Sequence, residues 1–312
     1  MPDVVRAAAL DLGSNTLRLL VADVYPGGWR AVARSLATPR LGGGLAGPGG
    51  RPRLDPAAKE RVRQAAEEFT ALARRLGARR VVLAATQACR RAADGEAFVA
   101  ELGQGLGLER ATVLSGEQEA ALSRLGVLSR LQGPRDGALL ADVGGGSTEL
   151  TPLDDEAAPA LSLQLGAVSL TEAHLASDPP LPAELTALDQ AVARGLQKVV
   201  PGARRLVATA GSAATLASLV QGLTDYQPEE VNNLRVSAGE LAGQARRLAA
   251  MPLARRREVP GLEPARADII LAGLAILRGL LERLGLDELT TMDAGLLEGI
   301  VLDDLAGWQY VE

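Results

Sequence analysis

The chain has 312 residues and a formal net charge of −5 at pH 7. This length suffices for two domains with their own hydrophobic cores, and the negative charge disfavours general nucleic-acid binding. The single cysteine, Cys89, and the single histidine, His174, exclude a disulfide framework, a thiolate metal cage and a metal site built from several histidines.

No stretch of the sequence is typical of a targeting or membrane-spanning segment. The N-terminal residues Met1–Asp3 lack the basic-then-apolar pattern of a signal peptide. The apolar stretch Ile269–Leu281 is shorter than the ~18–20 residues of a membrane span, and Arg278 interrupts it. We therefore expect a cytoplasmic protein.

The first part of the chain predicts three successive strands, followed by strands that alternate with helices. The expected strands are 4–11, 17–25, 29–36, 80–85 and 111–114, and the expected helices are 56–76, 95–105 and 115–131. The Gly/Pro-rich loop 39–52 is either a plain connector, which is the favoured interpretation, or a lid over a ligand. A polar turn at 132–137 predicts a domain boundary, so the first domain is expected to span 1–131.

The second part of the chain repeats this plan. The expected strands are 139–143, 148–153, 160–165, 205–209 and 288–292, and the expected helices are 183–200, 212–221, several within 237–284, and 294–302. The second domain is expected to span 132–312, and its last helix, about 294–312, is a candidate to pack back on the first domain. In both halves, consecutive strands are followed by strands that alternate with helices, and this order predicts an α/β fold with mixed sheets.

The most informative feature is a motif that occurs once in each half. Residues 9–19 align without gaps on residues 140–150, and in each copy an apolar strand ends on an aspartate, Asp11 or Asp142, before a turn of glycine and small polar residues. Glycine lets backbone N–H groups approach a phosphate, and the hydroxyl and amide side chains add donors. The predicted phosphate-binding residues of the two turns are Gly13, Ser14, Asn15, Thr16, Gly144, Gly145, Gly146 and Ser147.

An aspartate beside a bare phosphate is unfavourable unless a cation lies between them. Mg²⁺ favours one or two carboxylates together with phosphate oxygens, so the motif predicts Mg²⁺ and a phosphate chain held between two facing turns. Arg18 in the first copy aligns with Glu149 in the second, so one turn would present a cation and the other an anion. The alternative is a pair of glycine-rich turns without a ligand, which is less favoured because both copies match in register.

Three further positions follow predicted strands, where open α/β sheets bind ligands. Arg90 follows the strand 80–85, and its guanidinium would suit phosphate oxygens, although a solvated arginine is the simpler interpretation. Glu119 is either an ordinary carboxylate in the first turn of a helix or a general base that deprotonates water. The turn that contains Thr209, Gly211 and Ser212 opens a helix and is either an anion site or a simple connection.

Taken together, these motifs resemble the exopolyphosphatase / guanosine pentaphosphate phosphatase family, in its short two-domain form. The matching segments, in family order, are 11–18, 85–90, 114–120, 142–150, 209–212, 266–268 and 295–299. The resemblance implies two ribonuclease-H-like domains of the actin-like ATPase superfamily around a central cleft. It also implies Mg²⁺-dependent removal of the terminal phosphoryl group from inorganic polyphosphate or guanosine pentaphosphate, and a homodimer by family habit.

The resemblance assigns roles to individual residues. Glu119 then matches the family's catalytic base, and Asp142 and Glu149 match its metal-associated carboxylates. Arg90, which we count with Glu119 as catalytic, and the Asn15 turn match its phosphate holders. Asp11 is a third metal candidate, from its place in the duplicated motif. From the residues themselves, we also expect the second turn, Arg18 and the segment with Thr209, Gly211 and Ser212 to bind substrate phosphates. Leu297 stands where the family often has arginine, and Asn232 and Asn233 stand where a histidine is common.

Two other classes of protein share some of these features. A sugar or acetate kinase of the same superfamily would have similar turns but would need an adenosine pocket and an acceptor site, and the segment 115–120 argues against it. A non-enzymatic module that binds polyphosphate or an alarmone is disfavoured because all four acidic candidates are present. The sequence leaves open which of the two phosphate substrates is preferred.

Overall fold

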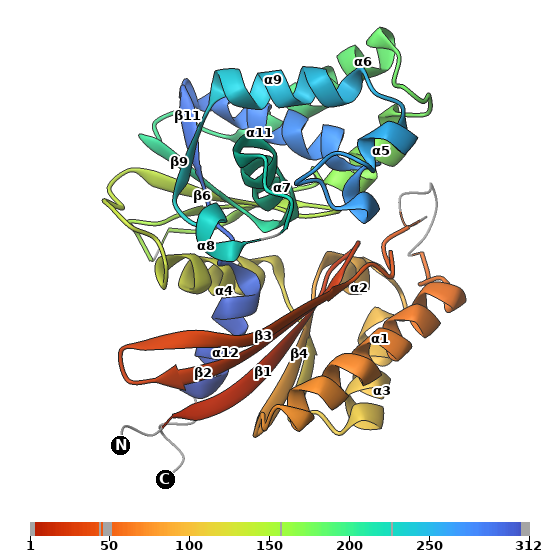
Figure 1. The fold of residues 1–312 in the computed structure, drawn as a ribbon, viewed down its shortest axis with the longest axis vertical. Coiled ribbons are helices and arrows are strands. Elements are labelled where there is room, and N and C mark those ends of the chain that lie inside the picture. Colours follow the sequence, from red (N-terminus) through yellow and green to blue (C-terminus); the bar gives the residue numbers. More distant parts are fainter. Residues whose placement is uncertain (1–3, 44, 46–51, 157, 226, 307–312) are drawn as a thin grey trace. The chain divides into compact units, whose positions relative to one another are not determined.

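The computed structural model describes residues 4–43, 45, 52–156, 158–225 and 227–306, and the chain forms two compact units (Figure 1). The first unit combines residues 1–129 with 295–312, and the second consists of residues 130–294. Each unit contains one mixed sheet with helices packed against it. In the described part of the chain, no helix is both long and apolar enough to span a bilayer.

The sheet of the first unit has the strand order β3-β2-β1-β4-β5. Its strands are β1 (Val5–Leu12), β2 (Leu17–Tyr25), β3 (Gly28–Ala37), β4 (Arg80–Ala85) and β5 (Arg110–Val113). The first three strands form an antiparallel meander, whereas β4 and β5 run parallel to β1. The carboxyl ends of β1, β4 and β5 therefore lie at one edge of the sheet, which is where open α/β sheets bind ligands.

Helices cover both faces of this sheet because successive residues of β1 are apolar and point to opposite faces. Leu10 and Leu12 belong to a core shared with α1 and α3, whereas Ala7 and Ala9 belong to a second core shared with α12. The helices of this unit are α1 (Pro56–Arg75), α2 (Gln87–Arg91), α3 (Gly95–Leu106), α4 (Gly116–Leu128) and α12 (Leu296–Ala306).

The last helix, α12, packs on α4, β1 and β2 of the first unit. The two helices approach closely at glycines: a methyl group at Gly126 would lie 1.8 Å from the carbonyl oxygen of Gly295, and one at Gly299 would lie 1.9 Å from that of Leu122. Ion pairs join α12 to the sheet, with Arg34 bonded to Glu298 at 2.7 Å. Helix α12 thereby completes the first unit.

The sheet of the second unit has the strand order β10-β11-β9-β6-β7-β8. Its strands are β6 (Ala138–Val143), β7 (Thr148–Pro152), β8 (Leu161–Leu163), β9 (Arg205–Thr209), β10 (Leu234–Ser237) and β11 (Glu288–Thr291). The strands β8-β7-β6-β9-β11 repeat the directions of β3-β2-β1-β4-β5, with β9 and β11 parallel to β6. The duplicated motif therefore belongs to a duplicated sheet.

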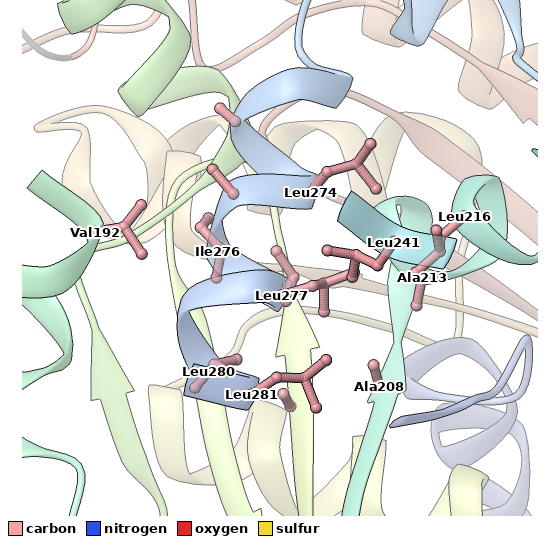
Figure 2. Packing of buried hydrophobic residues seen from close by; sticks show 14 of the residues in the cluster. Val192, Ala208, Ala213, Leu216, Leu241, Leu274, Ile276, Leu277, Leu280 and Leu281 are labelled. Atoms are coloured by element: carbon pink, nitrogen blue, oxygen red, sulfur yellow. The ribbon is translucent and has the colours of Figure 1, made fainter. Parts of the chain in front are cut away.

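The core of the second unit surrounds α11 (Ile270–Leu284), which is apolar on nearly all sides. Figure 2 shows Leu274 and Leu277 of α11 among side chains from α7 and α9, such as Leu216 and Leu241. The other helices of this unit are α5 (Ala167–His174), α6 (Pro182–Gly195), α7 (Ala210–Gln221), α8 (Pro228–Val231), α9 (Ala238–Ala249) and α10 (Leu253–Arg256), with short 3₁₀ helices at Leu196–Lys198 and Pro264–Arg266.

Candidate active site

The duplicated motif folds as the same element in both units. In the first copy Asp11 pairs across the ladder with Arg18, and in the second Asp142 pairs with Glu149. Each turn is closed by the same backbone bond, from Gly13 N to Thr16 O and from Gly144 N to Ser147 O, both 2.9 Å long. The gapless sequence alignment therefore corresponds to a structural equivalence.

In the first unit, the turn after β1 places its polar side chains in a buried position. Ser14, Asn15 and Thr16 are each less than 10% exposed. The Asn15 Nδ2 atom is buried and has no hydrogen-bond partner among the described residues. A buried amide donor without an acceptor costs about 1–3 kcal/mol, which points to an acceptor that belongs to a ligand.

Asp11 lies at the end of β1 and is bound by Arg18. The Nε and Nη2 atoms of Arg18 donate to Asp11 Oδ2 over 2.9 and 2.5 Å, and Asp11 is buried. The two side chains meet because directly opposite residues on antiparallel strands project to the same face. The charge of Asp11 is therefore balanced within the protein itself.

The second copy puts two carboxylates where the first has an ion pair. Asp142 and Glu149 are directly opposite on β6 and β7 and are 8% and 2% exposed. Glu149 Oε1 accepts a hydrogen bond of 3.0 Å from Ser162 Oγ. Like charges directly opposite on a sheet repel each other, and this repulsion favours a cation between them.

The donor set of Asp142 and Glu149 fits Mg²⁺, a hard cation that takes oxygen ligands and commonly uses only one or two carboxylates. Within the described residues, no group of three or more His, Cys, Asp or Glu side chains gathers into a complete metal cage. A cation at this pair would thus need oxygen atoms from substrate or water to fill its coordination shell. That requirement suits a phosphate-binding site.

Glu119 and Arg90 lie together at the carboxyl edge of the first sheet. Arg90 is on α2 after β4, and Glu119 is in the first turn of α4 after β5. Arg90 Nη1 donates to Glu119 Oε2 over 3.0 Å and to the Leu114 carbonyl over 2.7 Å. Glu119 is 7% exposed, so the guanidinium fixes a carboxylate that is largely withdrawn from solvent.

The first turn of α4 is defined by its own capping residues. Ser115 Oγ accepts from Gln118 N over 3.1 Å, and Gln118 Oε1 accepts from Ser115 N over 2.9 Å. This capping box fixes where the helix starts, and hence where Glu119 points. Helix-dipole stabilisation and a catalytic role are compatible here, because the same position serves both.

In the second unit, the turn between β9 and α7 brings together Thr209, Gly211 and Ser212, all three proposed from sequence. Thr209 Oγ1 donates to the Ala294 carbonyl over 2.9 Å, and Ser212 is 5% exposed. A methyl group at residue 211 would lie 1.8 Å from Nη1 of Arg266, so the guanidinium lies directly against the backbone of Gly211. The positive charge of Arg266 lies next to the partial positive charge at the N-terminus of α7, which is unfavourable. A bound anion would neutralise both positive charges.

Arg266 is the residue that the sequence-based assignment of roles missed. It precedes α11, and its Nε atom donates to Glu263 Oε2 over 2.8 Å. Only the motif 266–268 could have drawn attention to it, because its position against Gly211 depends on how the segment before α11 packs. Leu297, at the position where the resemblance implied an arginine, is a residue of α12 that is 3% exposed and belongs to the core between α12 and the first sheet.

The two mixed sheets and the duplicated strand–turn–strand motif form an α/β fold, as the sequence predicted, with two ribonuclease-H-like units, as the resemblance implied. The sequence model of the Ppx/GppA phosphatase family matches residues 20–307. The chain therefore belongs to the Ppx/GppA phosphatase family, and the resemblance inferred from the motifs is confirmed.

Individual relatives are similar to this protein over nearly the whole chain. Exopolyphosphatase 2 of Mycobacterium tuberculosis is 35% identical over 321 residues, covering 97% of this chain and 99% of that protein. The crystal structure of the Aquifex aeolicus Ppx/GppA family member is 28% identical, with a TM-score of 0.81 over 99% of this chain and 100% of that chain. An exopolyphosphatase structure from Cytophaga hutchinsonii is 19% identical with a TM-score of 0.83 over 97% of this chain and 98% of that chain, which supports the fold alone.

Proposed function

We propose that this protein is an exopolyphosphatase, which hydrolyses the terminal phosphoric anhydride of inorganic polyphosphate, and that guanosine pentaphosphate is the alternative substrate to test. The observation that carries the proposal is the buried carboxylate of Glu119, held by Arg90 at the carboxyl edge of the first sheet, where open α/β sheets bind ligands. The name of the M. tuberculosis relative supports this substrate class.

Glu119 has the role of general base in this proposal. Its carboxylate accepts a proton from water as the water oxygen forms a bond to the terminal phosphorus and the bridging P–O bond breaks. The products are orthophosphate and a chain shortened by one phosphoryl group. Arg90 restrains the base, since its Nη1 atom is also bonded to the Leu114 carbonyl. Phosphoryl transfer depends mainly on such positioning and on charge neutralisation.

The turns supply the phosphate contacts in this proposal. In the first unit Asn15 offers a buried amide donor, with Gly13, Ser14 and Thr16 around it. In the second unit the proposed contacts are Gly144, Gly145, Gly146, Ser147, Thr209, Gly211 and Ser212, with Arg266 added from the structure. Arg18 stays beside Asp11, where it holds a carboxylate that the sequence analysis also proposed as a metal ligand.

Asp142 and Glu149 are the proposed carboxylates for Mg²⁺. When bound, the ion would neutralise negative charge on the non-bridging phosphate oxygens. The protein's own contribution is to keep both carboxylates buried and facing the same side of the sheet. Ser162 holds Glu149 in place through its hydroxyl group.

The test is phosphate release from long polyphosphate, tripolyphosphate and guanosine pentaphosphate, each with and without Mg²⁺. We expect Mg²⁺-dependent release, and we expect Glu119→Gln to lower kcat at least ~100-fold, the scale of a lost general base. Glu117→Gln is the matched control, since Glu117 is an exposed carboxylate in the same helical turn. Unchanged turnover in Glu119→Gln would remove Glu119 from the mechanism, and ATP-dependent phosphorylation of an acceptor without phosphate release would favour a kinase.

A further inference from the structure

A short segment of the first unit, residues 39–43, is hydrogen-bonded to the Asn15 turn; we call it the strap. The Arg40 N–H donates to the Asn15 carbonyl over 3.0 Å, and the Gly42 N–H donates to the Ser14 carbonyl over 2.7 Å. Gly42 is required for this approach, because a methyl group there would lie 2.7 Å from the Ser14 Cβ atom. The strap is thus in direct contact with the turn that carries the candidate phosphate donor.

The strap is fixed at both sides of Arg40. The Pro39 carbonyl accepts two hydrogen bonds from Arg61, of 3.0 Å from Nε and 2.9 Å from Nη2. Leu41 is fully buried in the core beneath α1. Because its two neighbours are anchored, the backbone of Arg40 cannot move freely, and its exposed side chain starts from a defined point beside the Asn15 turn.

Arg40 has a backbone conformation that is unfavourable for arginine. Its φ angle is +54°, and among the described residues only Ala210 and Asn233 share a positive φ without being glycine. Ala210 lies in the candidate phosphate-binding turn between β9 and α7 in the second unit. Glycine would adopt this conformation without strain, and Asn or Asp would tolerate it better, so an arginine there indicates a role for the side chain.

We propose that Arg40 is a chain-length determinant, whose guanidinium binds phosphoryl groups of a long polyphosphate that extend beyond those held at the Asn15 turn. This inference rests on the proposed function. A guanidinium suits this task because it stays charged and donates to two oxygens of a phosphate at once. Tripolyphosphate, held at the turn, is too short to need this contact, whereas a long chain makes it throughout turnover.

The test compares Arg40→Gly and Arg40→Lys with the wild-type protein. Arg40→Gly removes the charge but suits the positive φ angle, so its Tm should equal or exceed that of the wild type. We expect its KM for long polyphosphate to rise about fivefold, the scale of one exposed ion pair, while kcat and the tripolyphosphate constants stay unchanged. Arg40→Lys keeps a charge and should recover part of the loss.

Arg79→Gly is the matched control, because it removes an exposed arginine beside the amino end of β4, at the opposite edge of the same sheet. Binding of long polyphosphate to Glu119→Gln, with and without Arg40→Gly, gives a second readout that needs no turnover. Equal effects of Arg40→Gly on long and short substrates, or no effect on either, would overturn the inference. An absence of phosphate release by the wild type, with binding still weakened by Arg40→Gly, would instead overturn the proposed function alone.

Discussion

Substitution of Asn15, which has a buried side-chain amide, can distinguish a structural role of this residue from a ligand-binding role. Its Nδ2 atom has no partner among the described residues, so removing it leaves no broken hydrogen bond in the free protein. We therefore expect Asn15→Ala to keep or raise Tm, because a buried unsatisfied donor disappears, while KM for polyphosphate rises about tenfold through the loss of a hydrogen bond to a charged group.

The matched control for Asn15 is Thr70 in α1, whose buried Oγ1 atom likewise lacks a partner in the described part of the chain. Thr70→Val removes that hydroxyl far from any candidate site residue in sequence and should raise Tm without changing KM. Thermal unfolding and steady-state kinetics on the two variants check both statements. A large drop in Tm for Asn15→Ala would show that Asn15 serves the fold.

The facing carboxylates Asp142 and Glu149 lead to a prediction about how Mg²⁺ changes the stability of the protein. We expect Mg²⁺ at about 100 times its dissociation constant to stabilise the wild type by about 2.7 kcal/mol, following mass action for a ligand of the native state. Glu149→Gln keeps a hydrogen-bond acceptor for Ser162 but removes one charge, so this stabilisation should largely vanish. The free energy of unfolding, measured with Mg²⁺ and with a chelator for each protein, tests this prediction. Glu172→Gln is the control, because Glu172 is an exposed carboxylate.

At the residue scale, the sequence predicted the duplicated turns and their acidic partners because the two copies align in register. It did not predict that Arg18 is bonded to Asp11, although the turn of residues 13–16 places these two positions directly opposite each other on the ladder. It could not assign a role to Arg266, because the contact with Gly211 joins segments that are distant in the chain. Contacts set by a local ladder were predictable, whereas those set by long-range packing were not.

At the element scale, the contact between α4 and α12 links the end of the chain to the helix that carries Glu119. A methyl group at Gly299 would lie 1.9 Å from the Leu122 carbonyl oxygen, so Gly299→Ala must push the helices apart. We expect it to lower the free energy of unfolding by about 1–3 kcal/mol, the usual scale of overpacking, and to lower kcat because α4 moves. Denaturant unfolding and kinetics test this.

Gly105 in α3 provides the control for that substitution. A methyl group at this helical glycine would meet nothing within 4 Å. Gly105→Ala should therefore raise the free energy of unfolding by about 0.4–1 kcal/mol, since alanine restricts the unfolded chain more than glycine does, and should leave kcat unchanged. If Gly299→Ala were as harmless as Gly105→Ala, the close helix contact would have no energetic importance.

A second prediction at this scale concerns the three-stranded meander, which Asp23 ties together. Arg6 in β1 donates to both Asp23 oxygens, at 2.7 and 3.0 Å, and Arg30 in β3 donates to Oδ2 at 3.3 Å. The hydrogen bonds from Arg6 lower the pKa of Asp23 below its ordinary value of 3.8, despite the opposing effect of burial. The resulting stabilisation is fully present above pH 3.8 and is lost as the pH falls through the lower, folded-state pKa.

Asp23→Asn should thus destabilise the protein at pH 7, and the difference from the wild type should shrink as the pH falls below about 4. Urea unfolding at several pH values measures this gap. Asp136→Asn serves as the control, because its ion pair with Arg204 is solvent-exposed and should contribute little at any pH. A gap for Asp23→Asn that stays constant down to pH 2 would contradict the prediction.

Most helices and strands were predictable from the sequence, because long helices have periodic apolar positions and long strands are apolar runs bounded by clear turn residues. The strands β1, β2 and β4 start and end within one residue of the predicted ranges. The four-residue edge strand β10 and the five-residue helix α2 were not predicted, since neither is long enough to show a period. Helix α4 ends at Leu128, before the predicted end at 131.

At the scale of the whole molecule, the first unit is built from two separate parts of the chain, and the second is a continuous insertion. The core beneath α12 contains Leu296, Leu297, Ile300 and Val301, all less than 5% exposed. Burial of four such side chains contributes about 6–12 kcal/mol, which is comparable to the stability of a whole domain. The second unit has its own core around α11 and includes none of these residues.

A chain that ends at Ala294 should therefore lose the structure of the first unit and keep that of the second. It lacks the four apolar side chains of α12 and leaves Arg34 and Arg80 without Glu298 and Asp304. We expect hydrogen exchange to show lost protection in β1 and β4 but retained protection in β6, β9 and α11, because the second core stays intact. Adding a peptide of residues 295–312 should restore protection to β1 and β4. Equal protection of both sheets in the truncated chain would show that α12 is dispensable, and equal loss in both would show that the second unit cannot fold by itself.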